Sequence, residues 1–126
     1  MLTAERVMIR RPITASPEES VARAMLTMTV HGIGGMPVVS DKGELLGMIT
    51  HRDLILAGKE AESLRVRDIM TTRLVTVAPE TPVKEVAEIM CTTGLQRLPV
   101  VRDKKLLGLV TQSCLIRVLL QLLSGR

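Results

Sequence analysis

The chain has 126 residues, of which 46% are apolar and 24% are charged, and its formal net charge is +4. This length suits one compact domain or two very small ones, and the composition excludes a mainly disordered chain. There is no Phe, Tyr or Trp, so aliphatic side chains and eight methionines must build the core. The lack of aromatic rings also argues against single-stranded nucleic-acid binding, which commonly uses aromatic stacking platforms.

The two cysteines, Cys91 and Cys114, form no CxxC motif and have no histidine cluster beside them. No metal site is therefore expected, and buried free thiols in apolar helices suit a reducing cytosol. The N-terminal segment lacks the apolar stretch of a signal peptide, and no apolar run reaches the roughly 18 residues that span a bilayer. These features predict a cytoplasmic protein without a membrane segment.

The predicted elements, in chain order, form two copies of one β-α-β-β-α unit. In the first copy, apolar periodicity and turn residues predict a strand at 13–15, a helix over 18–30, hairpin strands at 36–39 and 45–49, and a short helix over 51–57. The first helix has two possible caps, Ser16 and Ser20. In the second copy the strands are expected at 75–77, 98–101 and 106–110, and the last helix at 112–123. Thr81 is expected to cap the helix between them, with Pro82 at its first position.

The repeat fixes the predicted organisation of the chain. Pro37 corresponds to Pro99, and Gly47 corresponds to Gly108 after a one-residue deletion in the hairpin loop. A unit of about 50 residues buries its own sheet poorly, so the two units are expected to pack sheet against sheet about a pseudo-twofold axis. The predicted fold class is α/β (α+β). The predicted boundaries are residues 1–58 for the first repeat, 59–65 for the linker and 66–126 for the second repeat.

Both units resemble CBS domains. The resemblance rests on the segments MPVV-SDKGELLGMITHRDL and LPVV-RDKKLLGLVTQSCL and on the openings VMIRRPITASPEESV and DIMTTRLVTVAPETPV. It covers almost the whole chain, from about Val7 to Leu115. It implies a Bateman module, a disc-shaped pair of CBS repeats with two clefts. In this family a cleft can hold an adenosine-containing ligand such as AMP, ADP, ATP or S-adenosylmethionine.

The resemblance also implies how such a module works. It is expected to be no enzyme, to need no cofactor beyond its ligand, to form a homodimer and to signal to a separate effector protein. The residues agree, because the sequence contains no nucleophile–base–acid set, no metal-ligand spacing and no P-loop. Neither nucleic acid nor a membrane is expected as a partner.

The nucleotide signature of the family, Gly-h-h-Thr-x-x-Asp, is intact from Gly47 to Asp53. By this resemblance Asp53 accepts hydrogen bonds from the two ribose hydroxyls, and charge-assisted bonds of this kind are worth about 1.5–3 kcal/mol each. Thr50 would offer its hydroxyl to ribose or phosphate. The alternative for Asp53 is an acidic residue in a first helical turn, which is common without any ligand. The second unit keeps Thr111 but has Cys114 in the acid position, so its cleft is expected to be weak or empty.

The remaining candidates come from the strands around the cleft. The backbone near Thr14 and Ala15 and the MPV segment, Met36 to Val38, are expected to hold the base, or else to be only core strand residues. Arg97 is expected to reach a phosphate across the cleft, or else to be a solvated charge, and Arg52 is a weaker candidate. The full predicted ligand-binding set is Thr14, Ala15, Met36, Pro37, Val38, Thr50, Arg52, Asp53 and Arg97.

A second hypothesis is an interaction module whose clefts are empty. It rests on the C-terminal helix, which is apolar on more than one face and must therefore be covered. Its apolar residues are Leu115, Ile116, Val118, Leu119, Leu120, Leu122 and Leu123. Membrane-surface binding by this helix is a third reading, disfavoured because the helix is short and carries only Arg117 before the terminal Arg126.

Overall fold

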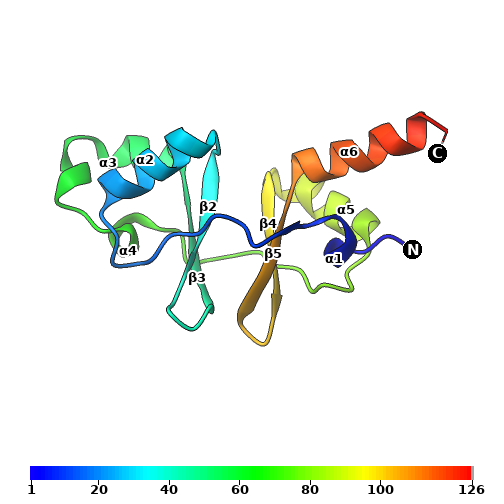
Figure 1. Ribbon diagram of the computed structural model, residues 1–126, viewed down its shortest axis with the longest axis horizontal. Coiled ribbons are helices and arrows are strands. Elements are labelled where there is room, and N and C mark those ends of the chain that lie inside the picture. The colour runs from blue at the N-terminus through cyan, green and yellow to red at the C-terminus, as the bar shows by residue number, and fades with distance from the viewer. Residues whose placement is uncertain (126) are drawn as a thin grey trace. The chain divides into compact units, whose positions relative to one another are not determined.

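The structure, a computed structural model, describes residues 1–125 (Figure 1). Helices and short strands alternate along the chain, and this confirms the predicted mixed α/β class. The elements are α1 (Ala4–Val7), β1 (Ile9–Arg10), α2 (Val21–His31), β2 (Gly35–Val39), β3 (Leu45–Thr50), α3 (His51–Ala57), the 3-10 helix η1 (Gly58–Glu62), α4 (Val66–Ile69), α5 (Val83–Thr93), β4 (Arg97–Arg102), β5 (Lys105–Thr111) and α6 (Gln112–Leu123).

The contacts divide the chain into two compact units. The central unit comprises residues 13–74, and the terminal unit comprises residues 1–12 together with the chain from residue 75 onward. Residues 1–12, at the start of the first repeat, therefore belong to the same unit as most of the second repeat, and residues 66–74, at the start of the second repeat, belong to the same unit as most of the first. The division predicted from the repeat, with its linker at 59–65, follows the sequence order and stays a prediction.

The central unit is built on the hairpin β2-β3, in which Met36 lies opposite Ile49 and Pro37 opposite Met48. Helix α2 packs on it and begins at Ser20, whose hydroxyl accepts a hydrogen bond from the N–H of Arg23 at 3.1 Å. Ser20 is thus the cap, whereas Ser16 only closes a preceding turn. The aliphatic core of this unit is formed by Ala15, Val21, Ala24, Met28, Met36, Val38, Ile49, Leu54 and Val66.

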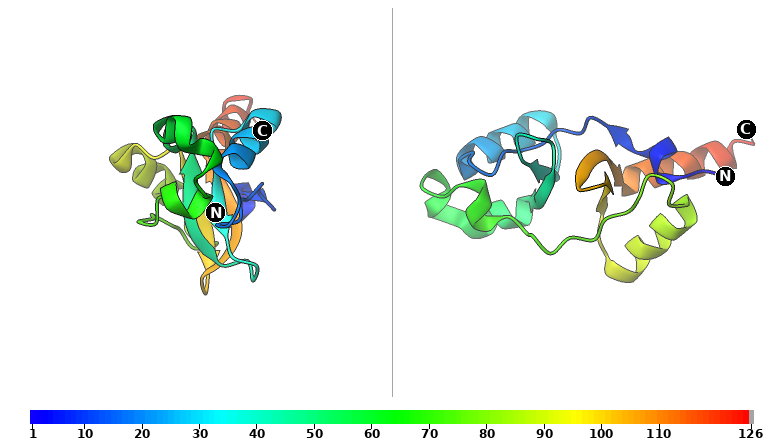
Figure 2. Two further views of the ribbon diagram at one scale, coloured as in Figure 1. Left: turned by 90° about the vertical axis from the view of Figure 1, so that its left-hand side faces the viewer. Right: turned by 90° about the horizontal axis from the view of Figure 1, so that it is seen from below.

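The terminal unit has a three-stranded antiparallel sheet in the order β1-β5-β4. Helix α1 of the N-terminal segment lies beside α5 and α6, as the views of Figure 2 show. The core of this unit is formed by Ala4, Val77, Val86, Met90, Leu98, Val100, Val110 and Cys114. Cys91 is exposed on α5, so the expectation that both thiols are buried was wrong for this residue.

The predicted first strand of each repeat is reduced to one parallel bridge. Ala15 pairs with Val38, and Val77 pairs with Val100. In the first repeat, the N–H of Ala15 donates to the carbonyl oxygen of Pro37 at 2.9 Å, and that of Val39 donates to Ala15 at 2.9 Å. The stretch around Ala15 is flanked by Pro12 and Pro17, which lack a backbone donor and so do not extend the ladder.

We call residues 1–12 and residues 63–74 the two straps, and each strap completes the start of a helix in the unit to which it belongs. The first N–H of α2, on Val21, donates to the carbonyl oxygen of Leu64, and the first N–H of α5, on Val83, donates to that of Leu2, both at 3.0 Å. The cap predicted on Thr81 was wrong. Its hydroxyl accepts from the N–H of Ala78 at 3.1 Å, so Leu2 supplies what a capping side chain would have supplied.

The straps also explain the glycine of the repeated signature. A Cβ at Gly47 would lie 2.8 Å from the carbonyl oxygen of Thr71, and one at Gly108 would lie 2.8 Å from that of Ile9. In the central unit, Thr71 and Met48 exchange two backbone hydrogen bonds of 2.9 Å. Glycine is therefore needed at both positions because a strap crosses the strand at van der Waals distance.

Candidate functional site

The central site residue, Asp53, lies at the junction of β3 and α3. Thr50 ends the strand with extended backbone angles and is the N-cap of the helix, which begins at His51. The Oδ2 atom of Asp53 accepts hydrogen bonds from the backbone N–H of Thr50 at 2.9 Å and from its hydroxyl at 3.1 Å. The N–H of Asp53 donates back to the hydroxyl oxygen of Thr50 at 3.5 Å. The two residues thus close a capping box, which fixes the direction of the carboxylate.

The half-buried side chain of Asp53 lines a small pocket of about 180 Å³ within the central unit. The other lining residues come from α3, η1 and the strap, and are Leu56, Ala57, Glu60, Leu64 and Ile69. Ligand sites for drug-sized molecules usually enclose about 300–1,000 Å³. The pocket therefore has room for a part of a nucleotide, such as its ribose, beside the carboxylate.

The residues predicted to hold the base meet in the central unit. The bridge between Ala15 and Val38 brings residues 14 and 15 against the MPV segment. Met36, Pro37 and Val38 are fully buried, whereas Thr14 is exposed. The N–H of Ala15 is already bonded to Pro37. Thr14 is therefore the most exposed residue of this group, and the role of the group in ligand binding stays a prediction.

The two predicted basic residues differ in their surroundings. Arg52, in the first turn of α3, is exposed. Arg97 belongs to the terminal unit, where it begins β4 and lies opposite Thr111. Its partial burial lowers the pKa of its guanidinium from the ordinary value, because desolvation disfavours the charged form. A phosphate would restore favourable surroundings for this charge, and that role also stays a prediction.

The corresponding junction of the terminal unit repeats the geometry with a thiol. Thr111 caps α6, and the Sγ atom of Cys114 lies 3.4 Å from the backbone nitrogen of Thr111 and 3.3 Å from its hydroxyl oxygen. Cys114 is 3% exposed. A thiol is only a weak hydrogen-bond acceptor. This junction therefore lacks the group that could hold a diol, although its backbone is arranged as in the central unit.

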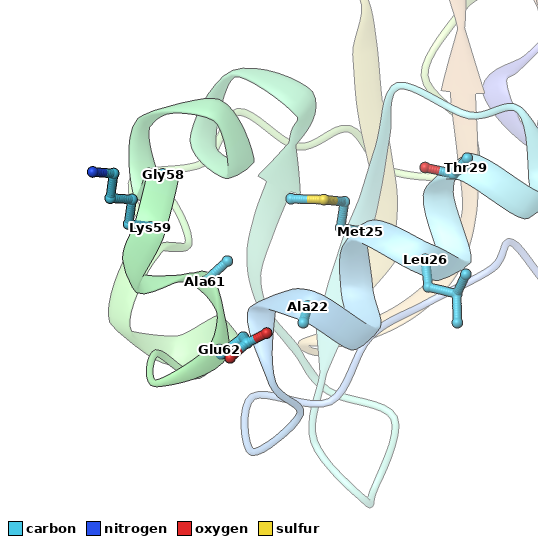
Figure 3. Close-up of a pocket in the computed structure, with 8 residues that line it drawn as sticks. All are labelled: Ala22, Met25, Leu26, Thr29, Gly58, Lys59, Ala61 and Glu62. Atoms are coloured by element: carbon cyan, nitrogen blue, oxygen red, sulfur yellow. The ribbon is translucent and has the colours of Figure 1, made fainter.

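A larger groove, of about 560 Å³, lies between α2 and η1 on the surface of the central unit (Figure 3). Its walls are mostly aliphatic and are formed by Ala22, Met25, Leu26, Thr29, Gly58, Lys59, Ala61 and Glu62. None of the nine predicted ligand-binding residues is among these lining residues. No sequence motif marks this groove, although Leu26 and Val30 give α2 a second apolar face.

The repeated fold and its capped strand–helix junctions define a tandem module of two small α/β domains. A model of the CBS domain matches residues 4–60 and again residues 66–121. The chain therefore belongs to the CBS domain family and contains two CBS domains, as its motifs predicted. No helix among residues 1–125 is long and apolar enough to cross a membrane.

Comparison with known proteins places this pair among similar modules. An inosine-5'-monophosphate dehydrogenase of Korarchaeum cryptofilum is 45% identical over 109 residues, which are 86% of this chain and 22% of that protein. The chain spans between about a fifth and three fifths of the length of the first curated relatives that it matches.

Among the similar solved structures are two complexes with adenosine-type ligands. CBSX2 in complex with AMP is 28% identical, with a TM-score of 0.88 over 97% of this chain and 98% of that chain. The CBS domain pair of protein MJ0100, in complex with 5'-methylthioadenosine and S-adenosyl-L-methionine, is 29% identical. Its TM-score is 0.82 over 94% of this chain and 99% of that chain. CBS pairs of this fold thus bind adenosine-type ligands.

Proposed function

We propose that the protein is a regulatory sensor that binds an adenine nucleotide or adenosine derivative through Asp53 and signals to a separate effector protein. The observation that carries this proposal is the intact Thr50–Asp53 junction, with its carboxylate on a pocket of about 180 Å³. The AMP and S-adenosylmethionine complexes of similar CBS pairs support the ligand class.

The chemistry of the carboxylate supports a ribose as the bound part. The two hydroxyls of a ribose both donate hydrogen bonds, and an ionised carboxylate only accepts them. The aliphatic side chains of Leu56, Leu64 and Ile69 line the same pocket and offer apolar contact to the carbon atoms of the sugar. The ribose would therefore be the anchor, with Thr14, Ala15 and the MPV segment at the base and Arg52 and Arg97 as candidates for phosphate contacts.

The proposal is that of a binding module, without catalysis and without a required metal or cofactor. Among residues 1–125, no group of three or more His, Cys, Asp and Glu side chains is placed to hold a metal ion. Binding energy alone is sufficient for a sensor, because a ligand that prefers one conformation shifts the population toward it.

A thermal-shift screen tests this function. AMP, ADP, ATP and S-adenosylmethionine are added separately to the protein, and the melting temperature is recorded. At 100 times the Kd, binding to the folded chain adds about 2.7 kcal/mol, which corresponds to a rise of roughly 5 °C or more. Asp53→Ala should abolish the rise, whereas the matched variant Cys114→Ala should keep it. A flat response of the unmodified protein to all four compounds refutes the proposal.

A second candidate function, self-association, is favoured by one observation on α6. Its Ile116, Leu119, Leu120, Leu122 and Leu123 are 52–74% exposed. Contiguous exposed apolar surface of this kind is typical of interaction sites. We propose that this face mediates a homodimer. Light scattering on the size-exclusion eluate should give twice the chain mass, and Leu119→Glu with Leu123→Glu should halve it. A monomer for the unmodified protein contradicts this candidate.

A further inference from the structure

We infer that Met70 is a site of reversible oxidation, and that its sulfoxide releases the strap 63–74 from strand β3 and thereby weakens ligand binding in the central unit. The release of the strap follows from contacts within this unit alone. The effect on the ligand rests on the proposed function, because it needs a ligand in the pocket of Asp53.

The eight methionines, all in the part of the chain that the structure describes, differ in exposure and in packing. Four of them are buried, namely Met28, Met36, Met48 and Met90. Met1 and Met25 are 98% and 39% exposed. Within residues 1–125, only Met8 and Met70 are partly buried and packed against a core cluster. An oxidant must reach the sulfur, and oxidation disrupts a structure only where the side chain is packed. Each strap therefore carries one candidate site.

The sulfur of Met70 lies on the glycine of the repeated signature. A Cβ at Gly47 would lie 2.9 Å from Sδ of Met70 and 2.8 Å from the carbonyl oxygen of Thr71. Met70 thus packs on the main chain of β3 beside the point where Thr71 and Met48 exchange two backbone hydrogen bonds of 2.9 Å. A thioether suits this contact, because it is only a weak hydrogen-bond acceptor.

Oxidation changes the polarity of this sulfur. Hydrogen peroxide transfers one oxygen atom to the thioether and leaves as water, so that the sulfur loses two electrons and becomes a sulfoxide. The sulfoxide oxygen is polar, and its burial without a hydrogen bond is costly. The N–H groups of Met48 and Thr71 are already bonded to each other's carbonyl oxygens. The sulfoxide is therefore expected to turn toward water and to break the contact between the strap and β3.

The same strap forms a wall of the ligand pocket. Leu64 and Ile69 line the pocket of Asp53, and Ile69 directly precedes Met70. When the strap leaves β3, the pocket loses this wall. Methionine sulfoxide reductases convert the sulfoxide back to the thioether, so the change is reversible. The oxidation state of Met70 would thus regulate ligand binding in the central unit.

The terminal unit provides a matched site. The sulfur of Met8 lies against Gly108 in the same way, and the next residue, Ile9, pairs with Leu109 in the sheet. Oxidation of Met8 should release the strap 1–12. Because the helix start of this unit has Cys114 in place of the acid, this release should leave ligand binding in the central unit unchanged.

Peroxide treatment of the unmodified protein, Met70→Leu and Met8→Leu tests the inference. Leucine keeps an apolar side chain of similar volume that cannot be oxidised. Peptide mass spectrometry follows each methionine, with the exposed Met25 as the reference, and hydrogen exchange follows the backbone amides of Met48 and Thr71. Titration with AMP and with S-adenosylmethionine measures ligand binding. A thiol reductant added afterwards reverses sulfenic acid or disulfide formation at the exposed Cys91 and leaves sulfoxides in place.

The unmodified protein and Met8→Leu should gain a sulfoxide at Met70. The amides of Met48 and Thr71 should then exchange about tenfold faster or more, and the affinity for the ligand should fall severalfold. A methionine sulfoxide reductase should reverse both changes. Met70→Leu should keep its exchange rates and its affinity after the same treatment.

Three results overturn the inference. If Met70 stays unoxidised while Met25 is fully oxidised, its sulfur is no modification site. If Met70 is oxidised and the exchange of Met48 and Thr71 is unchanged, the sulfoxide does not release the strap. If the strap is released and the affinity is unchanged, the strap does not support the pocket. If the unmodified protein binds neither compound before oxidation, the proposed function fails, and the exchange rates alone decide whether the strap is released.

Discussion

Thr50 donates two hydrogen bonds to one oxygen of Asp53, from its backbone N–H at 2.9 Å and from its hydroxyl at 3.1 Å. The carboxylate that we assign to ligand binding is therefore also a helix-capping group. The sequence allowed two roles for Asp53, as a ribose acceptor or as an acidic residue of a first helical turn. These two roles are compatible. The capping interaction is present without any ligand, and the hydrogen bonds from Thr50 are accepted by Oδ2 and not by Oδ1.

The capping role predicts a measurable effect on stability. Asp53→Ala should lower the free energy of unfolding by about 1 kcal/mol, because the carboxylate loses its hydrogen bonds from the backbone N–H and the hydroxyl of Thr50 and its favourable interaction with the helix dipole. Urea denaturation without ligand measures this change. A loss above about 4 kcal/mol would show that Asp53 has a larger structural role than the capping box provides.

The strap contacts predict that the signature glycines are structural in both units. Gly47→Ala and Gly108→Ala should each destabilise the protein by about 1–3 kcal/mol, since the added methyl group meets a backbone oxygen that can move only with its strap. Leu46→Ala, at a residue of the same strand that is 37% exposed, is the control and should have a smaller effect. Equal melting temperatures for Gly47→Ala and the unmodified protein would contradict the close approach.

The matched junctions predict a gain of function. Cys114→Asp should create a second ligand-binding site in each chain. Thr111 already presents its N–H and hydroxyl to position 114, as Thr50 presents them to Asp53 in the central unit. The new carboxylate would be held by two donors, which offsets part of the cost of its burial. Titration with a ligand that binds the unmodified protein should show the stoichiometry rise from one toward two. An unchanged stoichiometry in a folded variant would show that more than the acid is missing from this unit.

The ion pair between Arg67 and Glu18 predicts only a small effect. It joins the strap to the loop before α2, but both side chains are more than half exposed. Exposed pairs contribute about 0–1 kcal/mol because water screens them. Arg67→Ala should therefore change the free energy of unfolding by no more than about 1 kcal/mol, with little dependence on salt. A larger loss in thermal or urea melts would show that the pair holds the strap in place.

Much of the fold could be predicted from the repeat. Both hairpins lie within one residue of their expected strands, and α6 covers the predicted residues 112–123. These elements are set by local patterns, namely apolar periodicity, a glycine in the loop and a threonine at the helix start. The correspondence of Cys114 to Asp53, inferred from the same repeat, is confirmed by their equal positions in two capping boxes.

The exchange of straps could not be predicted in this way. The carbonyl oxygen of Leu64 accepts the first N–H of α2, which lies far away in the sequence, and that of Leu2 accepts the first N–H of α5, which lies in the other repeat. No local sequence pattern encodes such a partner. The same contacts explain one error and one role that the motif did not reveal. Thr81 is unnecessary as a cap because the carbonyl oxygen of Leu2 accepts the first N–H of α5, and Gly47 has a packing role in addition to its place in the nucleotide signature. The site residues were predicted from a motif, but the pairing that orders Asp53 required the structure.

The account depends most on the Asp53 carboxylate as the ligand anchor, and calorimetric titration with AMP and with S-adenosylmethionine tests it most directly. We predict saturable binding of at least one of them, with one ligand per chain, and its loss in Asp53→Ala but not in Cys114→Ala. Binding of equal strength in folded Asp53→Ala, or no heat of binding in the unmodified protein, would contradict the account.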